Sequence, residues 1–375
     1  MANLGAGLEG VVATTSKICF IDGDAGVLSY FGYNIHTLAE NATFEEVIYL
    51  LWHGKLPNKG ELQQLKTELS AERDLPAEVT TFLKDVPQGS SPMEVLRTAV
   101  SMLSLYDPLS RDNSSEANAK KAVKLMARIS TIVTSFERLR NNKSIVPGEP
   151  GLSYAANFLL ALTGKQPDDV MERVFDVALI LHADHELNAS TFAARVTAAT
   201  LSDIYSAVVS AIGALKGPLH GGANEDVIRM LLSTRSSDEA VQKVTNDLNN
   251  KVKVSGFGHR VYKTLDPRAG HLKKLSEELG KRTGHTDLYE KSSRVEKTVH
   301  DLKKLNANVD FYSASTYYSL GIPTDLFTPI FAVSRMSGWI AHVLEQYSNN
   351  RLIRPRADYT GAPDGQEWIP LEQRA

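Results

Sequence analysis

The hydrophobic and polar positions follow a helical period along most of the chain. Residues 91–94 (SPME) have the form of a capping box with proline at the first helical position, and apolar residues then recur every three or four positions as far as Leu103. Ser236 with Glu239 caps a second such segment, and Thr328-Pro329 opens a long third one. The same period predicts helices over 118–138, 168–187, 190–200, 202–216, 268–282 and 291–305.

The first 35 residues have a different pattern. Two short apolar or alternating runs, 18–21 (ICFI) and 27–31 (VLSYF), flank the turn-rich segment 22–26 (DGDAG). This arrangement predicts a small β-hairpin. Strands do not alternate repeatedly with helices, which argues against a doubly wound sheet. We therefore predict an all-α fold with a minor N-terminal β-hairpin.

Breaks in the helical pattern indicate how the chain is divided. Polar, turn-forming segments occur at 107–116, 141–150 and 283–290, and strong helix stops occur at 217–222 (GPLHGG) and 321–323 (GIP). A chain of 375 residues suits one large or two moderate domains. The two stops therefore predict a unit of about a hundred residues inserted into a larger body.

Composition and charge exclude several classes of protein. Hydrophobic residues make up 42% and charged residues 23%, as in ordinary globular proteins, and the net charge of −3 gives no overall basic field for nucleic acid or an anionic membrane. No apolar run is long enough for a transmembrane helix, and the N-terminal MANLGAGLEG lacks the features of a secretory signal. The single cysteine, Cys19, cannot form an internal disulfide, so we expect a cytoplasmic protein.

One segment departs from this balance. Residues 251–304 carry a net charge of +7, whereas the rest of the chain carries −10. Solvated helix faces would explain the excess, and so would a local site for a polyanionic ligand.

Two histidines lie in glycine-rich segments. His220 lies in KGPLHGGAN, where glycines allow close approach to the backbone and a following helix would favour the neutral imidazole. His259 lies in SGFGHRVYK, beside Arg260 and Lys263, a loop suited to phosphate or adenine but a poor dinucleotide fingerprint. An incidental histidine in a glycine turn is the alternative for His220.

Other candidate residues carry charge. Asp266 is placed to cap the next helix, Pro267 would stand at its start, and Arg268 would be held in its first turn, where a fixed guanidinium can bind a carboxylate. Asp310, among apolar and aromatic neighbours, is either a desolvated base or an ordinary first-turn aspartate. Arg335, on an apolar helix face, needs an anion if it is buried.

A metal site is a further hypothesis. His182 and His185 would share one face of the predicted helix, but the order is not H-E-x-x-H and no third ligand is evident. Arg354 lies in a polar C-terminal segment that is either functional or simply solvated.

Taken together, the motifs resemble the citrate synthase family, in its shorter bacterial and archaeal type. LHADHELNAS, LKGPLHGGANE, GFGHRVYKTLDPRAG, NVDFYS, FTPIFAVSRMSGW and IRPRA occur in the family's order over nearly the whole chain. The resemblance implies an all-α, two-domain fold. Residues 1–220 and 322–375 would form a large domain with the dimer interface and the oxaloacetate site, and 221–321 a small, mobile, CoA-binding domain.

The resemblance also implies the chemistry. Asp310 would remove a proton from the methyl group of acetyl-CoA, His220 would stabilise the enolate, and His259 would activate the oxaloacetate carbonyl before citryl-CoA is hydrolysed. The oxaloacetate ligands would be His185, His220, His259, Arg268, Arg335 and, from the partner of a homodimer or higher oligomer, Arg354. CoA contacts would be Gly256, Phe257, Gly258, Arg260 and Lys263. No metal and no cofactor is expected.

Three alternatives stay open at the level of sequence. A 2-methylcitrate synthase would use the same residues on propionyl-CoA, since one methylene changes binding by only about 1–3 kcal/mol. A metal hydrolase would use His182 and His185. A catalytically silent binding or scaffold protein would bind ligands without turnover.

Overall fold

The computed structural model describes residues 6–8 and 10–374, so part of the N-terminal segment used to exclude a secretory signal lies outside the described residues. A small antiparallel sheet has the order β1 (Cys19–Asp22), β2 (Val27–Tyr30), β3 (Tyr33–Asn34), with Cys19 opposite Tyr30. The predicted hairpin is confirmed. The third strand was not predicted, because two residues after a tight turn at Gly32 are too short to show alternation.

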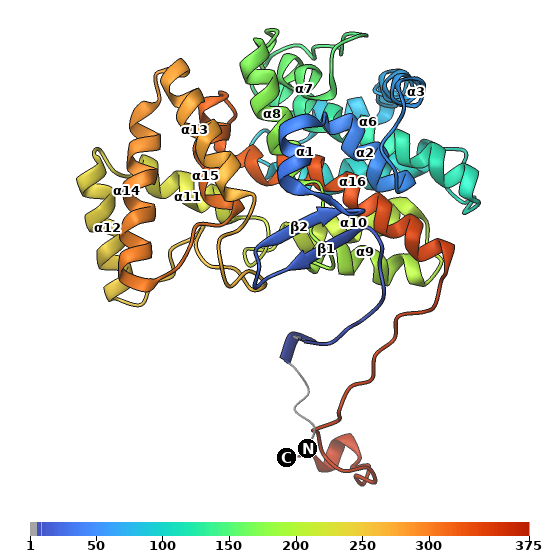
Figure 1. Ribbon diagram of the computed structural model, residues 1–375. Helices are drawn as coiled ribbons and strands as arrows, with labels where there is room; N and C mark the ends of the chain where they lie inside the picture. Colours follow the sequence, from blue (N-terminus) through green and yellow to red (C-terminus); the bar gives the residue numbers. More distant parts are fainter. Residues whose placement is uncertain (1–5, 9, 375) are drawn as a thin grey trace.

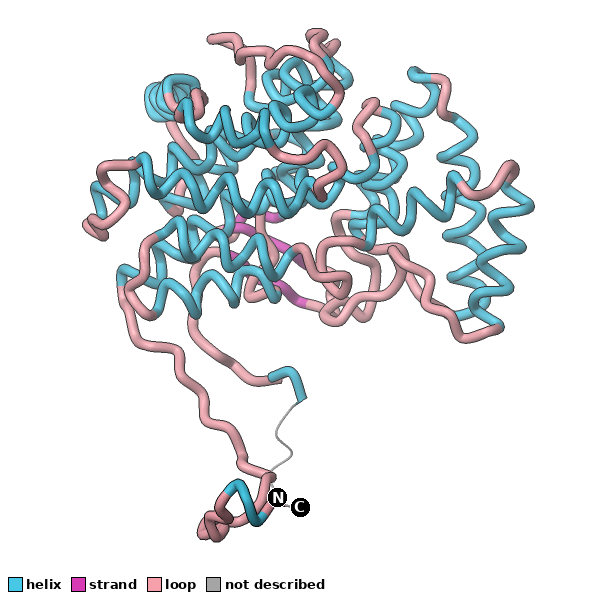
Figure 2. Tube along the Cα trace, turned by 180° about the vertical axis from the view of Figure 1, so that it is seen from behind, coloured by secondary structure: helices cyan, strands magenta, loops and turns pink. Residues whose placement is uncertain are grey.

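The main body is a stack of helices behind and above this sheet (Figure 1, Figure 2). The long α6 and α16 run through it and pack against each other and against their neighbours. Its helices are α1 (Ile35–Asn41), α2 (Phe44–His53), α3 (Lys59–Ala71), α4 (Ala77–Asp85), α5 (Pro92–Leu103), α6 (Ser115–Arg140), α7 (Tyr154–Thr163), α8 (Asp169–His182), α9 (Ala189–Ala199), α10 (Ile204–Leu215) and α16 (Phe327–Ser348).

A second group of helices lies to one side of the main body, at the left of Figure 1. It consists of α11 (Ala223–Leu232), α12 (Ser237–Asn249), α13 (Ala269–Thr283), α14 (Thr286–Lys303) and α15 (Val309–Ser319), which pack chiefly on one another. This group coincides with the segment between the two predicted helix stops. The two groups of helices and the small sheet together confirm the predicted all-α fold with a minor N-terminal β-hairpin.

Some predicted helix boundaries were wrong. The helix predicted over 168–187 ends at His182, and the break predicted at 283–290 is shorter because α14 begins at Thr286. Ser91 is the N-cap of α5, as predicted, but its side chain makes no capping hydrogen bond. At Ser236 the predicted cap is present, since its side chain accepts a hydrogen bond from the N–H of Glu239.

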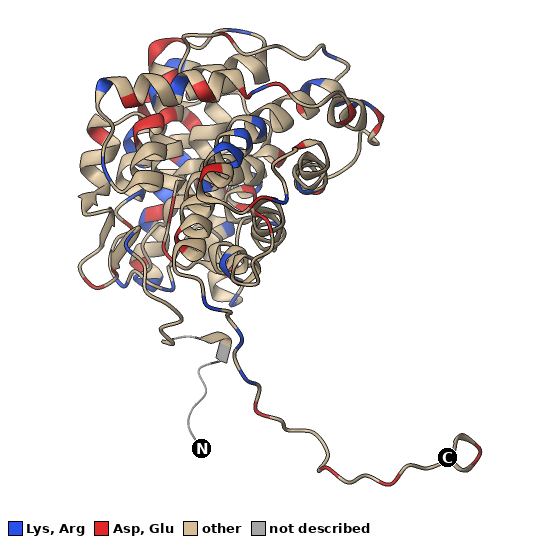
Figure 3. Cartoon of the chain, turned by 90° about the vertical axis from the view of Figure 1, so that its right-hand side faces the viewer, with Lys and Arg blue, Asp and Glu red and all other residues tan. Residues whose placement is uncertain are grey.

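The described C-terminal segment leaves the main body after α16. Asn350 and Arg351 are still hydrogen-bonded to the body, and residues 352–374 form a largely exposed tail apart from it (Figure 3). Among the described residues, no helix is both long enough and apolar enough to span a membrane.

Candidate active site

His220 lies in the turn between α10 and α11. Its backbone N–H donates to the carbonyl of Gly217 at 2.9 Å, and the N–H of Gly221 donates to that of Leu215 at 3.0 Å. A Cβ at Gly221 would lie only 2.4 Å from the Leu215 oxygen, so the turn requires glycine there. The tight turn fixes the imidazole just before α11, which begins after Gly222 as predicted.

The hydrogen bonds of His220 define its protonation state. Its Nε2 accepts from the backbone N–H of Ser190 at 3.3 Å and lies 2.9 Å from Ser190 Oγ. Because a backbone N–H can only donate, Nε2 carries the lone pair and Nδ1 carries the hydrogen. Burial, together with the charge of Arg335, lowers the pKa of His220 to about 4. The neutral ring can therefore donate a hydrogen bond from Nδ1.

His259 is held in the opposite tautomer. Its Nδ1 accepts from the backbone N–H groups of Val261 at 3.0 Å and Tyr262 at 3.2 Å, so Nε2 carries the hydrogen. Burial, together with the charge of Arg268, lowers the pKa of His259 to about 4. This ring is thus also a neutral donor, through Nε2.

His185 is the buried neighbour of His259. The two ring centroids are 5.1 Å apart, and His185 Nε2 lies 3.1 Å from the hydroxyl of Tyr262. Burial and the charge of Arg268 hold the pKa of His185 well below its usual value. The ring is neutral at physiological pH and can bind a polar ligand without adding charge.

Arg268 is fixed by a buried carboxylate. Its Nε and Nη2 donate to the two oxygens of Asp266 at 2.9 and 2.8 Å, and both side chains are almost fully buried. Asp266 was predicted to cap the helix, but α13 begins at Ala269 with Arg268 as its N-cap. The structure therefore places Arg268 before the first turn, where the carboxylate orients its guanidinium.

Arg335 is a buried cation of a different kind. It is 1% exposed, its Nε donates to the carbonyl of His182 at 2.7 Å, and its guanidinium lies 4.8 Å from the centroid of the Phe331 ring. Within the described part of the chain, no carboxylate forms a salt bridge with it. A buried guanidinium in this setting suits an anionic ligand.

Asp310 lies in the first turn of α15, where its backbone N–H donates to Asn308 Oδ1 at 3.0 Å. Its own Oδ1 is buried and has no hydrogen-bond partner among the described residues. Burial raises the pKa of Asp310 to about 6. The carboxylate is thus a stronger base than an exposed aspartate and is still ionised at neutral pH.

The two arginines connect these groups electrostatically. Besides burial, the positive charge of Arg335 lowers the pKa of His220, and that of Arg268 lowers the pKa of His259. Both charges lower the pKa of His185 and partly offset the effect of burial, which raises the pKa of Asp310. The candidate residues come from the turn before α11, the loop before α13, α15 and α16, so they are far apart in sequence and gathered by the fold.

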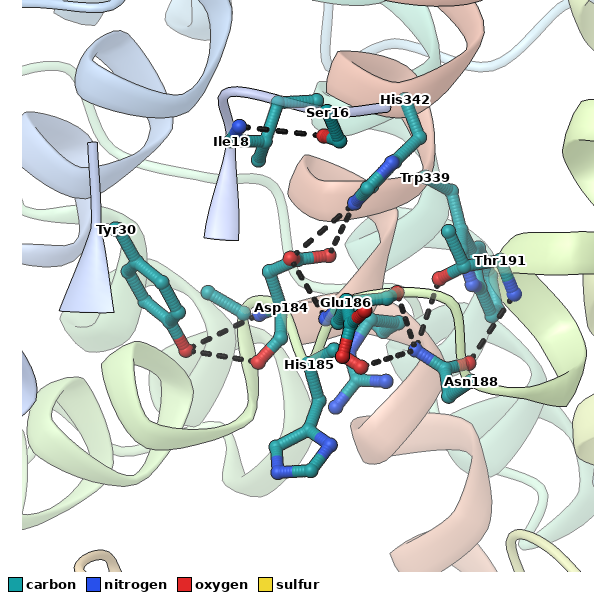
Figure 4. A network of polar contacts seen from close by, with 12 residues as sticks. Ser16, Ile18, Tyr30, Asp184, His185, Glu186, Asn188, Thr191, Trp339 and His342 are labelled. Carbon is teal, nitrogen blue, oxygen red and sulfur yellow. Dashed lines mark hydrogen bonds and ion pairs between the residues drawn. The ribbon is translucent and has the colours of Figure 1, made fainter. Parts of the chain in front are cut away.

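Figure 4 shows the turn that carries His185. Asp184 Oδ2 accepts from the N–H of Glu186 at 3.2 Å, and the Asp184 carbonyl accepts from the Tyr30 hydroxyl at 3.0 Å. Glu186 has a φ of 52°. These contacts end α8 at His182, together with the hydrogen bond from Arg335 to the His182 carbonyl. The observed helix is therefore shorter than the predicted one.

The end of α8 separates His182 from His185, the two histidines predicted as possible metal ligands. His182 lies at the end of α8 and His185 beyond it, so the two do not share a helix face. His182 Nδ1 lies 2.8 Å from the Ala178 carbonyl, and burial lowers the pKa of His182 to about 3. Across residues 6–8 and 10–374, no group of three or more His, Cys, Asp or Glu side chains is placed to hold a metal ion.

A cavity of about 530 Å³ opens beside His259. The predicted Phe257, Gly258 and Arg260 line it, together with Lys251, Lys253 and Lys303, which the sequence motifs did not single out. The only sequence signal for these lysines is the +7 charge of residues 251–304. The cavity is therefore basic, with apolar walls that include Leu248, Val254, Val299 and Leu305.

Two predicted CoA contacts lie outside this lining. Gly256, with a φ of +85°, is required for packing, since a Cβ would lie 2.8 Å from Val227 Cγ2. Lys263 is exposed and pairs with Asp24 at 3.2 Å. Arg354 lies in the exposed tail, and among the described residues it forms no hydrogen bond or salt bridge with the other candidate residues.

The structure is thus a mostly helical protein in which two buried neutral histidines, a buried carboxylate and two buried arginines influence one another. Comparisons with known proteins place it in a family. The family model described as the citrate synthase C-terminal domain matches residues 7–356. The chain belongs to the citrate synthase family, whose members are transferases.

Individual relatives support the assignment to this family. The chain is 56% identical to "Citrate synthase 2" of Bacillus subtilis, over 98% of this chain and 99% of that protein, and 51% identical to the citrate synthase of Haloferax volcanii, over 98% of both. It is 42% identical to a 2-methylcitrate synthase of Shewanella oneidensis, over 99% and 98%. A solved ternary complex of carboxymethyl coenzyme A and oxaloacetate with the citrate synthase of Thermoplasma acidophilum superimposes with a TM-score of 0.92 at 34% identity, covering 98% and 99%.

Proposed function

We propose that this protein condenses acetyl-CoA with oxaloacetate and water to give citrate and CoA, the first step of the tricarboxylic acid cycle. The observation that carries the proposal is the hydrogen-bonding geometry of the two histidines, together with the burial of the Asp310 carboxylate. His220 and His259 are neutral donors in opposite tautomers, and Asp310 is a buried carboxylate with a raised pKa. This combination suits removal of a proton from a weak carbon acid.

Asp310 removes a proton from the methyl group of acetyl-CoA. The Nδ1–H of His220 donates to the thioester oxygen and stabilises the enolate, or delivers its proton to give the enol, as charge develops there. The histidine need not lose a proton before donating. The buried carboxylate is a better base than one in water, because water does not stabilise its charge.

His259 activates the other substrate. Its Nε2–H donates to the keto oxygen of oxaloacetate, which becomes an alkoxide when the new carbon–carbon bond forms and takes up a proton. Hydrolysis of the citryl-CoA thioester then releases citrate and CoA.

Oxaloacetate is held through its two carboxylates. Arg268 and Arg335 are fixed cations that bind them, and His185 adds a neutral donor or acceptor. The exposed position of Arg354 supports its donation to the active site of a second subunit in a homodimer. Assembly beyond a dimer and a cytoplasmic location stay predictions.

CoA binds the basic cavity beside His259. The phosphates meet Arg260 and the lysines of the lining, and the adenine meets the backbone of residues 257–258. The reaction uses no cofactor in this scheme.

The two groups of helices correspond to the large domain, 1–220 with 322–375, and the mobile small domain, 221–321. The small domain closes over the substrates and excludes water from the enolate.

The first test is release of free thiol from acetyl-CoA and from propionyl-CoA, each with oxaloacetate, compared as kcat/KM. We expect a strong preference for acetyl-CoA. A preference for propionyl-CoA would keep every residue role and make the protein a 2-methylcitrate synthase, as the name of the Shewanella relative suggests. Release from neither substrate would contradict the proposal.

Shared use of Arg354 is tested by complementation. Arg354→Ala and Asp310→Ala should each be nearly inactive as homodimers because each lacks one part of every site. Mixed dimers should regain part of the activity, since one site then combines an intact Asp310 with Arg354 of the partner subunit. Well-folded mixed dimers without recovered activity would show that Arg354 does not act across the interface.

A further inference from the structure

Arg195, in α9, is a buried guanidinium that the reaction scheme does not use. It is 3% exposed, and within the described part of the chain the hydrogen-bond partners of its side chain all lie on α16. Its Nε donates to Gln346 Oε1 at 3.1 Å, and its Nη1 donates to Glu345 Oε2 at 2.7 Å and to His342 Nδ1 at 3.1 Å. Burying these polar groups costs free energy. The groups that the network orients therefore indicate its role.

One branch of this network leads to the oxaloacetate site. Because arginine can only donate, His342 Nδ1 is an acceptor and Nε2 carries the hydrogen, which points to Asp184 Oδ2 at 3.3 Å. Asp184 in turn accepts from the N–H of Glu186 (Figure 4). His342 and Asp184 are completely buried. Arg195 thus fixes the orientation of the imidazole that holds the turn carrying His185.

A second branch leads to the C-terminal tail. The side-chain amide of Gln346 accepts from Arg195 and donates through Nε2 to Asn350 Oδ1 at 3.0 Å and to the Arg351 carbonyl at 3.3 Å. The accepted hydrogen bond fixes which end of the amide faces the tail. Arg354 follows three residues after this anchored carbonyl, so the direction in which the tail leaves α16 is set here.

We propose that Arg195 is a positioning residue for the oxaloacetate site, holding the His185 turn through His342 and the base of the Arg354 tail through Gln346. The inference rests on the proposed function and on the donation of Arg354 to the partner. One Arg195 then serves two sites, its own through His185 and the partner's through Arg354. A lysine could not replace it, because one ammonium cannot span the same planar set of acceptors.

The test compares three variants. Arg195→Met removes both branches and Gln346→Met removes the tail branch. Arg128→Met is the matched control, since Arg128, on α6, is also an arginine with little exposure, and it is bonded to Glu72 at the end of α3. We expect Arg195→Met to raise the KM and the calorimetric Kd for oxaloacetate by about tenfold or more, as for other residues that orient a ligand-binding group. The KM for acetyl-CoA should change little. Gln346→Met should show a smaller rise and Arg128→Met none.

Mixed dimers separate the two branches. In the first, Arg195→Met pairs with Asp310→Ala, so the active subunit has a loosened His185 turn and an intact Arg354 of the partner subunit. In the second, a subunit with both substitutions pairs with a wild-type subunit, so only the tail that reaches the active site is loosened. Both should show a raised KM for oxaloacetate compared with the dimer of wild type and Asp310→Ala.

The outcomes decide between explanations. If folded Arg195→Met binds oxaloacetate as wild type does, the inference is wrong, and if only the second mixed dimer is normal, the tail branch is wrong. If Arg195→Met does not fold, Gln346→Met and Arg195→Lys are measured in its place, and a normal Kd in both overturns the inference. Failure of the wild-type protein to bind oxaloacetate would instead reject the proposed function.

Discussion

At the scale of single residues, backbone groups decide the chemistry of the two histidines. The N–H of Ser190 faces Nε2 of His220, whereas the N–H groups of Val261 and Tyr262 face Nδ1 of His259. Each ring is left with one N–H to donate. Protonation of either ring would oppose one of these bonds as well as burial. The site is therefore prepared to donate hydrogen bonds at neutral pH.

We predict that kcat/KM for acetyl-CoA falls below pH about 6. Burial raises the pKa of Asp310 to about 6, and the base works only when ionised, so activity is complete above this pH and is lost as the pH falls through it. His220 and His259, with pKa values of about 4, stay neutral over the same range. A pH–rate profile without an acid limb between pH 5 and 7 would contradict the assignment.

Asp310→Asn tests the base directly. Turnover should fall by several orders of magnitude, while the calorimetric Kd for oxaloacetate stays near that of wild type. The fold should not suffer at pH 8. The raised pKa means that the ionised carboxylate is unfavourable in the folded state above pH about 6, and asparagine removes that charge. Thermal unfolding at pH 8 provides the control, and near-normal turnover would remove Asp310 as the base.

The candidate residues could be predicted from the sequence, but their environments could not. Glycine-flanked histidines and a carboxylate among aromatic residues pointed to chemistry, and the order of motifs pointed to a family. Ser190 and Arg195 carry no such signal, because each acts through a partner about thirty or 150 residues away. Asp266 was interpreted as a helix cap because the sequence does not show that Asp266 and Arg268 are buried together.

At the scale of elements, the structure relates the basic segment to a cavity. Residues 251–260 and α14 place Lys251, Lys253 and Lys303 around one volume beside His259. Helical periodicity predicted α5, α6, α8, α9, α10, α12, α13, α14 and α16, but it assigned no range to α1–α4, α7 or α15. Helix α15 is buried on nearly all sides, so it shows no single apolar stripe. The helix ends were less predictable, because they depend on contacts with distant residues. Helix α8 ends where Arg335 donates to the carbonyl of His182 and the Tyr30 hydroxyl donates to that of Asp184.

We predict that Lys251→Ala and Lys303→Ala each raise the KM for acetyl-CoA about tenfold with little change in kcat, because they remove a charge from the phosphate-binding wall and not from the reacting atoms. The oxaloacetate Kd should be unchanged. Lys297→Ala, also on α14 but outside the lining, is the matched control. An unchanged KM in both lining variants would show that CoA does not use this cavity.

At the scale of the whole molecule, the turn of the small sheet contacts the loop between α12 and α13. The two groups of helices also meet directly, where α8 packs on α13 and α15. The carbonyl of Gly23 accepts from the N–H of Lys263 at 3.0 Å, and Gly26 lies against Thr264 and Leu265. The contacted loop holds Tyr262, whose hydroxyl meets His185. A change in the contact between this loop and the sheet turn would therefore act directly on His185, in the proposed oxaloacetate site.

Gly23→Ala tests this coupling. A Cβ at Gly23 would lie 2.1 Å from the Val261 oxygen, so the turn and the loop must separate, whereas the Gly23 backbone itself accepts alanine without strain. We expect a higher KM for oxaloacetate and, in small-angle scattering, a larger radius of gyration with saturating oxaloacetate than in wild type. Gly89→Ala is the control, because no atom lies within 4 Å of its added Cβ. If Gly23→Ala matches wild type in both measurements, this contact does not help to close the molecule over its substrate, and closure must depend on the bound oxaloacetate alone.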